Sequence, residues 1–141
     1  MSNNRKFYIN GEWVEPTGSD TVDVINPATE DVIGTIALGT HADVDAAVAA
    51  AQSAFETFSQ TTVEERLELL NKITEIIGAR SEDLASAITS EMGAPNGLAK
   101  AAQAGTGLFH FATTAGILAN FSFEEELGKN LIVKEPVGVV G

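Results

Sequence analysis

Two histidines are the side chains of this sequence best suited to acid–base chemistry at neutral pH. His41 and His110 lie far apart in the sequence, and no ordered set of acidic partners accompanies either one. We interpret His41 as an exposed polar residue beside the start of a helix. His110 lies between two phenylalanines, which favours a histidine at the edge of the core over a general base or a metal ligand.

The common sequence motifs of nucleophilic catalysis and of metal binding are absent. Cysteine is absent, which excludes disulfides, thiolate metal sites and thiol nucleophiles within these residues. There is no G-x-S-x-G nucleophile motif and no His/Cys cluster with the spacing of a metal site. The acidic run at 124–126 is interpreted as a solvated surface turn, since charge runs are commonly solvated. No metal site is expected.

Two glycine-containing stretches resemble parts of phosphate-binding loops. Residues 105–107 read G-T-G, but they are expected inside a helix, where small residues favour close packing; the nucleotide fingerprint belongs between a strand and a helix. Residues 137–141 read V-G-V-V-G, which is typical of a strand that opens a nucleotide-binding unit. The helix that would complete this motif is not in the sequence.

Composition indicates a packed and acidic protein. The 141 residues include 20 acidic and 8 basic side chains, a formal net charge of −12, and 44% hydrophobic residues. This balance disfavours binding to nucleic acids or to anionic membranes, because both require a positive surface. No run of 18 apolar residues and no signal-peptide pattern is present, so the cytoplasm is the expected location.

The spacing of apolar residues predicts three regions. Residues 1–40 are expected to form a β-hairpin around Asn10-Gly11, the strongest short hairpin signal, followed by two more strands at 22–25 and 32–38 in a small antiparallel meander. Residues 41–120 change to a helical period. Residues 129–141 are expected to form strands at 130–133 and 137–141. The sequence ends inside an apolar β run, so we expect a longer natural chain.

Helix boundaries in the middle region follow from capping residues. Thr40 and Thr62 are predicted N-caps, and Thr62 has Glu65 three residues later in a capping box. Gly78 and Gly93 are predicted to end the second and third helices. The third helix is expected to begin at a Ser81 cap, and the fourth to run from Pro95 to about residue 120.

Five segments resemble the amino-terminal portion of the aldehyde dehydrogenase superfamily, in order and in spacing over nearly the whole chain. They are F-Y-I-N-G-E-W-V at 7–14, V-I-N-P-A-T-E at 24–30, D-V-D-A-A-V-A-A-A at 43–51, E-M-G-A-P at 91–95 and E-P-V-G-V-V-G at 135–141. Each motif alone is weakly specific, but five in register are specific.

The resemblance implies an α/β fold: an N-terminal β-meander, a helical bundle, and the first strands of a truncated Rossmann-type domain. It also implies an enzyme that oxidises an aldehyde to an acid with NAD or NADP and forms a homo-oligomer. The family's catalytic cysteine, oxyanion asparagine and general-base glutamate all fall beyond Gly141. This segment is therefore expected to contain no catalytic and no cofactor-binding residue, and to be inactive alone.

One functional surface is implied by the same resemblance. In the family, the helix after the E-x-G-x-P motif lines the aldehyde entrance tunnel, and its register assigns Ala102, Thr106 and, more weakly, Phe109 to that surface. The alternative is that these residues pack between helices. Where some members hold a monovalent cation, this sequence has Met92, which cannot bind a hard cation. A stand-alone structural or interaction module derived from the family is the alternative function.

Overall fold

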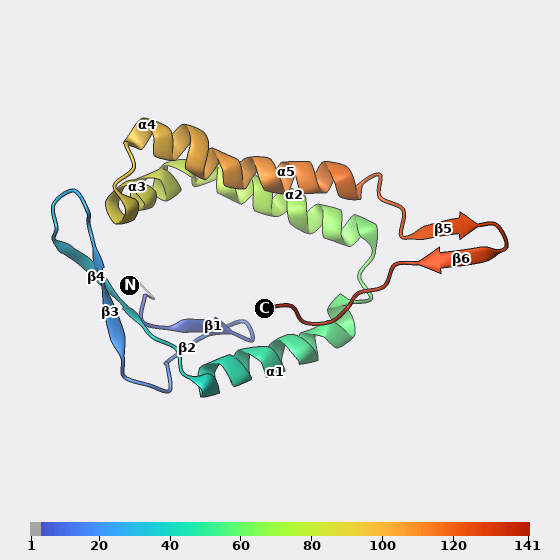
Figure 1. Ribbon diagram of the computed structural model, residues 1–141, viewed down its shortest axis with the longest axis horizontal. Coiled ribbons are helices and arrows are strands. Elements are labelled where there is room, and N and C mark those ends of the chain that lie inside the picture. The colour runs from blue at the N-terminus through green and yellow to red at the C-terminus, as the bar shows by residue number, and fades with distance from the viewer. Residues whose placement is uncertain (1–3) are drawn as a thin grey trace.

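The computed structural model describes residues 4–141, and it shows a mixed α/β chain with short strands and long helices (Figure 1). In chain order the elements are β1 (Phe7–Ile9), β2 (Glu12–Val14), β3 (Thr21–Ile25), β4 (Val32–Ala37), α1 (His41–Phe58), α2 (Val63–Ala79), α3 (Ser81–Met92), α4 (Asn96–Leu98), η1 (Ala99–Ala104), α5 (Gly105–Leu118), β5 (Glu124–Leu127) and β6 (Asn130–Val133). No helix within residues 4–141 has the length and apolar content needed to cross a bilayer.

The first four strands form two separate hairpins and not one meander. Strand β1 pairs only with β2, and β3 only with β4, both antiparallel. Asn10 and Gly11 adopt φ values of 54° and 81°, which confirms the tight turn between the first two strands. Between β2 and β3, the Thr17 N–H donates to a side chain of α1. The Thr17 N–H is therefore not available for a β-sheet hydrogen bond that would join the two hairpins.

The predicted caps of the first two helices are confirmed. The Thr40 and Thr62 side chains each accept from the backbone three residues on, and an acidic side chain returns the bond in a capping box. Gly93 ends α3 with φ of 72°. Two boundaries were wrong: α2 continues past Gly78, and Ser81 is already helical in α3. Arg80, between α2 and α3, has φ of −106° and is not left-handed. Its carbonyl accepts from the Leu84 N–H, so α3 begins directly after α2.

The fourth predicted helix is interrupted by a π-helical segment. Its residues 96–118 are helical throughout, but η1 has the wider π turn, and the Gly105 N–H donates to Lys100 O five residues back. The expectation of one regular helix was therefore incomplete. Pro95 lies at the N-cap, just before the helix.

The acidic run belongs to a strand. Strand β5 contains residues 124–127, which pair with β6 in a hairpin that projects from the end of the helices (Figure 1). These glutamates are exposed as expected, but the predicted turn was wrong. The predicted strand at 130–133 is present, whereas 137–141 forms no strand. A strand requires a hydrogen-bonded neighbour, and none of the described strands pairs with this segment.

The buried apolar residues of the described part of the chain are small. They are Ala85, Ala99, Ala104 and Ala115, and no large side chain there is fully buried. Helix α2 lies along α5, and η1 packs on α3 (Figure 1). Helix α1 lies on the other side of the molecule, where it contacts β1. Of the described apolar residues, only alanines are buried between the helices; several apolar side chains of α2, including Leu70 and Ile73, are half-buried, and many other large apolar side chains remain exposed.

Candidate functional site

The candidate substrate-facing residues share one exposed face of the fourth helical region. Ala102 and Thr106 are four residues apart, and Phe109 follows three later, spacings that place side chains on the same side of a helix. All three are exposed, Phe109 by 65%. They do not pack between helices in this structure. The assignment of this face to the aldehyde route stays a prediction.

The π turn determines which residues occupy that face. Ala99 and Ala104 are 0% and 5% exposed although they are five residues apart. In an α-helix, such a pair is rotated by about 140° and cannot share a contact surface. The wider turn of η1 brings both alanines to the packed side. The exposed face carrying Ala102 and Thr106 is thereby turned away from the packed helices.

Two side-chain contacts hold this region. The Thr106 hydroxyl donates a hydrogen bond to the carbonyl of Ala102, which joins two of the candidate residues directly. Lys100 forms an ion pair with Glu82 and ties η1 to α3. Because its hydroxyl proton is engaged, Thr106 can accept a hydrogen bond from a ligand but has no donor left for one. The face is thus chiefly apolar, which suits an organic substrate better than an ion.

Neither histidine is part of an acid–base pair. His41 is exposed, as predicted. His110 is also exposed, and its ring contacts Phe109 with centroids 6.0 Å apart. The predicted place at the core edge was therefore wrong. Residues 4–141 contain no hydrogen bond between a histidine and a carboxylate, and no cluster of three potential metal-ligating side chains. Met92 is exposed.

Two of the sequence motifs meet in space beside this helix. A Cβ at Gly93 would lie 2.8 Å from the Pro27 ring carbon Cγ, so the turn after β3 packs directly against the end of α3. Gly93 has φ of 72°, a conformation that glycine adopts without strain. This contact fixes the chain direction just before Pro95, where the candidate helix begins.

Asp43 is the one buried charged residue identified in the described chain, with 7% exposure. Its carboxylate accepts hydrogen bonds from the backbone N–H groups of Thr40 at 2.7 Å and Thr17 at 2.9 Å, and from both hydroxyls. These bonds, with that from the Thr40 backbone as the largest cause, lower the pKa of Asp43 to about 2. The sequence predicted the helix start at Thr40 but did not indicate that the Asp43 carboxylate is buried. Its partner Thr17 comes from a distant loop, which periodicity does not predict.

Known proteins resemble this chain in sequence. The sequence profile of the aldehyde dehydrogenase family matches residues 13–141. The whole chain is 49% identical to 3-succinoylsemialdehyde-pyridine dehydrogenase of a Pseudomonas species and 48% identical to a putative aldehyde dehydrogenase of Staphylococcus aureus strain MSSA476. In both cases the chain spans 30% of the relative's length.

Solved structures agree with the sequence relatives. An aldehyde dehydrogenase of Bartonella henselae superimposes with a TM-score of 0.87 at 43% identity, over 92% of this chain and 28% of that one. A mutant aldehyde dehydrogenase C of Pseudomonas syringae, complexed with NAD+ and octanal, also gives 0.87, at 41% identity over 89% and 26%. With the profile match and the shared fold in agreement, this chain belongs to the aldehyde dehydrogenase family and corresponds to the amino-terminal portion of its members.

Proposed function

We propose that this chain serves as the amino-terminal segment of an NAD(P)-dependent aldehyde dehydrogenase that oxidises an aldehyde to a carboxylic acid. The observation that carries the proposal is identity of 49% over the entire chain with a dehydrogenase of which it spans 30%. Structural neighbours complexed with NAD+ support the cofactor. A homo-oligomeric enzyme in the cytoplasm belongs to the same proposal.

The chain's role in this enzyme is structural and substrate-binding. It has no cysteine for the nucleophile, and we assign no catalytic, cofactor-binding or metal-binding residue to it. When bound, NAD or NADP accepts the hydride removed from the substrate. Residues 137–141 form no strand here, so the described residues do not by themselves provide the strand that opens a dinucleotide site. We therefore expect the 141-residue chain to be inactive alone.

The exposed face of η1 and α5 is the proposed contribution to substrate binding. Ala102 leaves room beside the helix, Thr106 has its hydroxyl engaged, and Phe109 presents an exposed aromatic ring. Such a surface binds the organic part of an aldehyde by burial of apolar area. The carbonyl chemistry itself takes place elsewhere in the enzyme.

A chimeric enzyme tests this function. The matching segment of the 49% identical Pseudomonas dehydrogenase is replaced by residues 1–141, and NADH formation from that enzyme's own aldehyde substrate is measured at 340 nm. We expect the chimera to be active and the isolated chain to give no NADH. Turnover by the isolated chain, or a folded chimera that binds NAD+ but is inactive, would contradict the proposal and favour a separate interaction module.

A further inference from the structure

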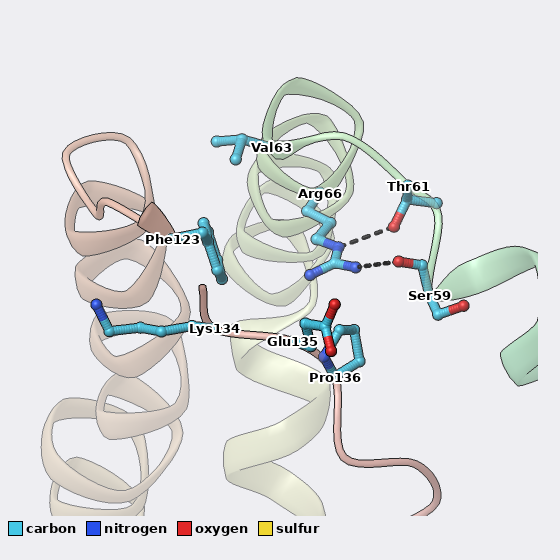
Figure 2. Close-up of a pocket in the computed structure, with 8 residues that line it drawn as sticks. All are labelled: Ser59, Thr61, Val63, Arg66, Phe123, Lys134, Glu135 and Pro136. Atoms are coloured by element: carbon cyan, nitrogen blue, oxygen red, sulfur yellow. Dashed lines mark hydrogen bonds between the residues drawn. The ribbon is translucent and has the colours of Figure 1, made fainter. Parts of the chain in front are cut away.

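A cavity of about 290 Å³ lies where the β5–β6 hairpin joins the turn between α1 and α2 (Figure 2). It is lined by side chains from three chain segments: Ser59, Thr61, Val63, Arg66, Phe123, Lys134, Glu135 and Pro136. None of these residues belongs to the exposed face proposed for the aldehyde. The cavity is therefore a separate feature of the chain.

Arg66 directs part of its guanidinium group into this cavity. Its Nε donates to the Thr61 hydroxyl at 2.8 Å, and one terminal nitrogen donates to the carbonyls of Phe58 and Ser59 at 3.4 Å. The guanidinium carbon also lies 5.7 Å from the Phe58 ring centroid. A guanidinium has five N–H groups in a planar fork. These contacts leave the other terminal nitrogen, Nη1, available for an acceptor.

The positive charge of Arg66 has no carboxylate partner in the described chain. Ion pairs there join Lys6 to Glu15, Lys72 to Glu75, Arg80 to Asp83, Lys100 to Glu82 and Lys134 to Glu125, but none includes Arg66. Arg66 is half-buried, and a half-buried guanidinium is stabilised by an anion with fork geometry. The Glu135 carboxylate lines the same cavity, but it does not form an ion pair with Arg66 within 4 Å.

The other lining residues restrict the kind of anion. Val63, Phe123 and Pro136 provide apolar walls. Lys134 contributes little charge to the cavity, since its ammonium donates to Ser122 O at 3.2 Å and lies 3.8 Å from Glu125; Figure 2 shows it directed away from Arg66. The Glu135 carboxylate lines the same cavity. It repels any anion there, but it repels a doubly charged phosphate about twice as strongly as a singly charged carboxylate.

We propose that this cavity binds a single carboxylate carried on a small apolar group, with the free edge of Arg66 as its donor. The carboxylate accepts from Nη1, and the apolar group lies against Val63, Phe123 and Pro136. The same chemistry is available from a free monocarboxylic acid and from an acidic side chain of another polypeptide segment. The site does not depend on the proposed dehydrogenase function.

Binding is measured by NMR on the ¹⁵N-labelled 141-residue chain, at low salt and at a protein concentration where sedimentation velocity shows a monomer, from the Nε–H signal of Arg66 and the amides of residues 59–66. The probes are butyrate, inorganic phosphate, and a short capped peptide with one glutamate between leucines. We expect saturable shifts with butyrate and much weaker ones with phosphate. A tighter response to the peptide than to butyrate identifies a polypeptide source, and the reverse order identifies a free acid.

Three variants separate this site from the effect of overall charge. Arg66→Gln and Lys134→Gln each remove one positive charge from the cavity lining, but only the first removes the free donor edge. We expect Arg66→Gln to weaken butyrate binding by about tenfold or more and Lys134→Gln to change it by less than about twofold. Glu135→Gln, which leaves Arg66 intact, should strengthen it by about two- to fivefold because a like charge is removed.

Several outcomes would overturn the proposal. These are the absence of saturable shifts at Arg66 in the folded chain, equal losses in Arg66→Gln and Lys134→Gln, or phosphate binding as tight as butyrate. Arg66 also holds the end of α1, so its glutamine variant requires a check of folding by circular dichroism. If that variant unfolds, the Glu135→Gln result decides alone: unchanged affinity contradicts the site.

Discussion

At the residue scale, Asp43 joins two segments that lie far apart in the sequence. Its carboxylate accepts from Thr17 in the loop after β2 and from Thr40 at the start of α1. Gly18 permits this approach, because a Cβ there would lie 2.8 Å from the Thr40 methyl carbon. Asp43 therefore holds the loop on the end of the helix.

The lowered pKa of Asp43 gives a pH dependence of known sign. The folded-state pKa is about 2, against 3.8 for the unperturbed group, so the contribution is complete above pH 4 and is lost as pH falls from about 4 to about 2. Asp43→Asn should lower the urea midpoint at pH 7 and show a smaller loss over this window. Urea unfolding of both proteins at several pH values checks this. Parallel loss in the two proteins would contradict the assignment.

Gly93 and Gly107 provide a matched pair for backbone effects. Alanine at Gly93 meets Pro27 and must adopt φ of 72°, so Gly93→Ala should destabilise by roughly 1 to 3 kcal/mol. Gly107 is helical with no atom within 4 Å of a built Cβ, so Gly107→Ala should stabilise by roughly 0.5 to 1 kcal/mol. Denaturant unfolding measures both. Undiminished stability of the Gly93→Ala chain would show that the tight contact and the positive φ at Gly93 do not matter.

At the element scale, the π segment η1 packs on α3 and continues into α5, which packs along α2. Ala99 and Ala104 are both buried five residues apart, while α5 lies along α2. Wide π turns interrupt helices frequently at functional sites. Here the turn determines that Ala102 and Thr106 are exposed and that the alanines are packed.

Deletion of Ala101 should convert the π turn to an α turn, in which Ala99 and Ala104 become four residues apart and differ by only about 40° around the helix. We expect both alanines to stay on the packed side and stability to be largely retained, and Ala101→Ser should also have little effect. Because the chain lacks cysteine, maleimide labelling of Thr106→Cys and Ala104→Cys reports exposure directly. A large loss of stability, or a labelling contrast that reverses after the deletion, would contradict this role of η1.

The elements that the sequence predicted correctly depend on local signals. The Asn10-Gly11 turn, the caps at Thr40 and Thr62, and the end of α3 at Gly93 each follow from a few adjacent residues. The π turn and strand β5 depend on contacts with distant elements, namely α3 and β6. Local propensity does not encode such contacts, so the sequence predicted a regular helix and a turn there.

The candidate sites also divide into those indicated by local sequence signals and those that depend on contacts between distant segments. The exposed face at Ala102, Thr106 and Phe109 was expected from a resemblance, and helical spacing then placed the three together. The cavity at Arg66 was not predicted, because its walls come from segments about 60 residues apart that meet only in the fold. The buried state of Asp43 escaped prediction for the same reason: Thr17 is 26 residues away.

At the scale of the whole molecule, the chain exposes much apolar surface. Phe109, Ile117 and Val137 are 65%, 60% and 90% exposed, and many other large apolar side chains are also accessible. Large exposed apolar patches promote association. The charge of −12 opposes it by repulsion.

We therefore expect the isolated chain to self-associate, more strongly at high salt, where repulsion is screened. Sedimentation velocity at several protein concentrations and at low and high salt measures this. Phe109→Ser should reduce association if the η1–α5 face participates, and Asn71→Ser, at an exposed and uncharged position of α2, is the control. A monodisperse monomer with a sharp cooperative melt at all concentrations would contradict the expectation.

The central claim is that residues 1–141 give an aldehyde dehydrogenase its scaffold and one wall of the aldehyde route, without contributing to the bond chemistry. The most direct measurement is steady-state kinetics of the chimeric enzyme with Ala102→Trp, which fills the exposed face, and with Ala101→Ser as control. The account predicts a rise of about tenfold or more in KM for the aldehyde, with kcat and the KM for NAD+ changed less than about twofold. An unchanged aldehyde KM, or a loss confined to kcat, would contradict it.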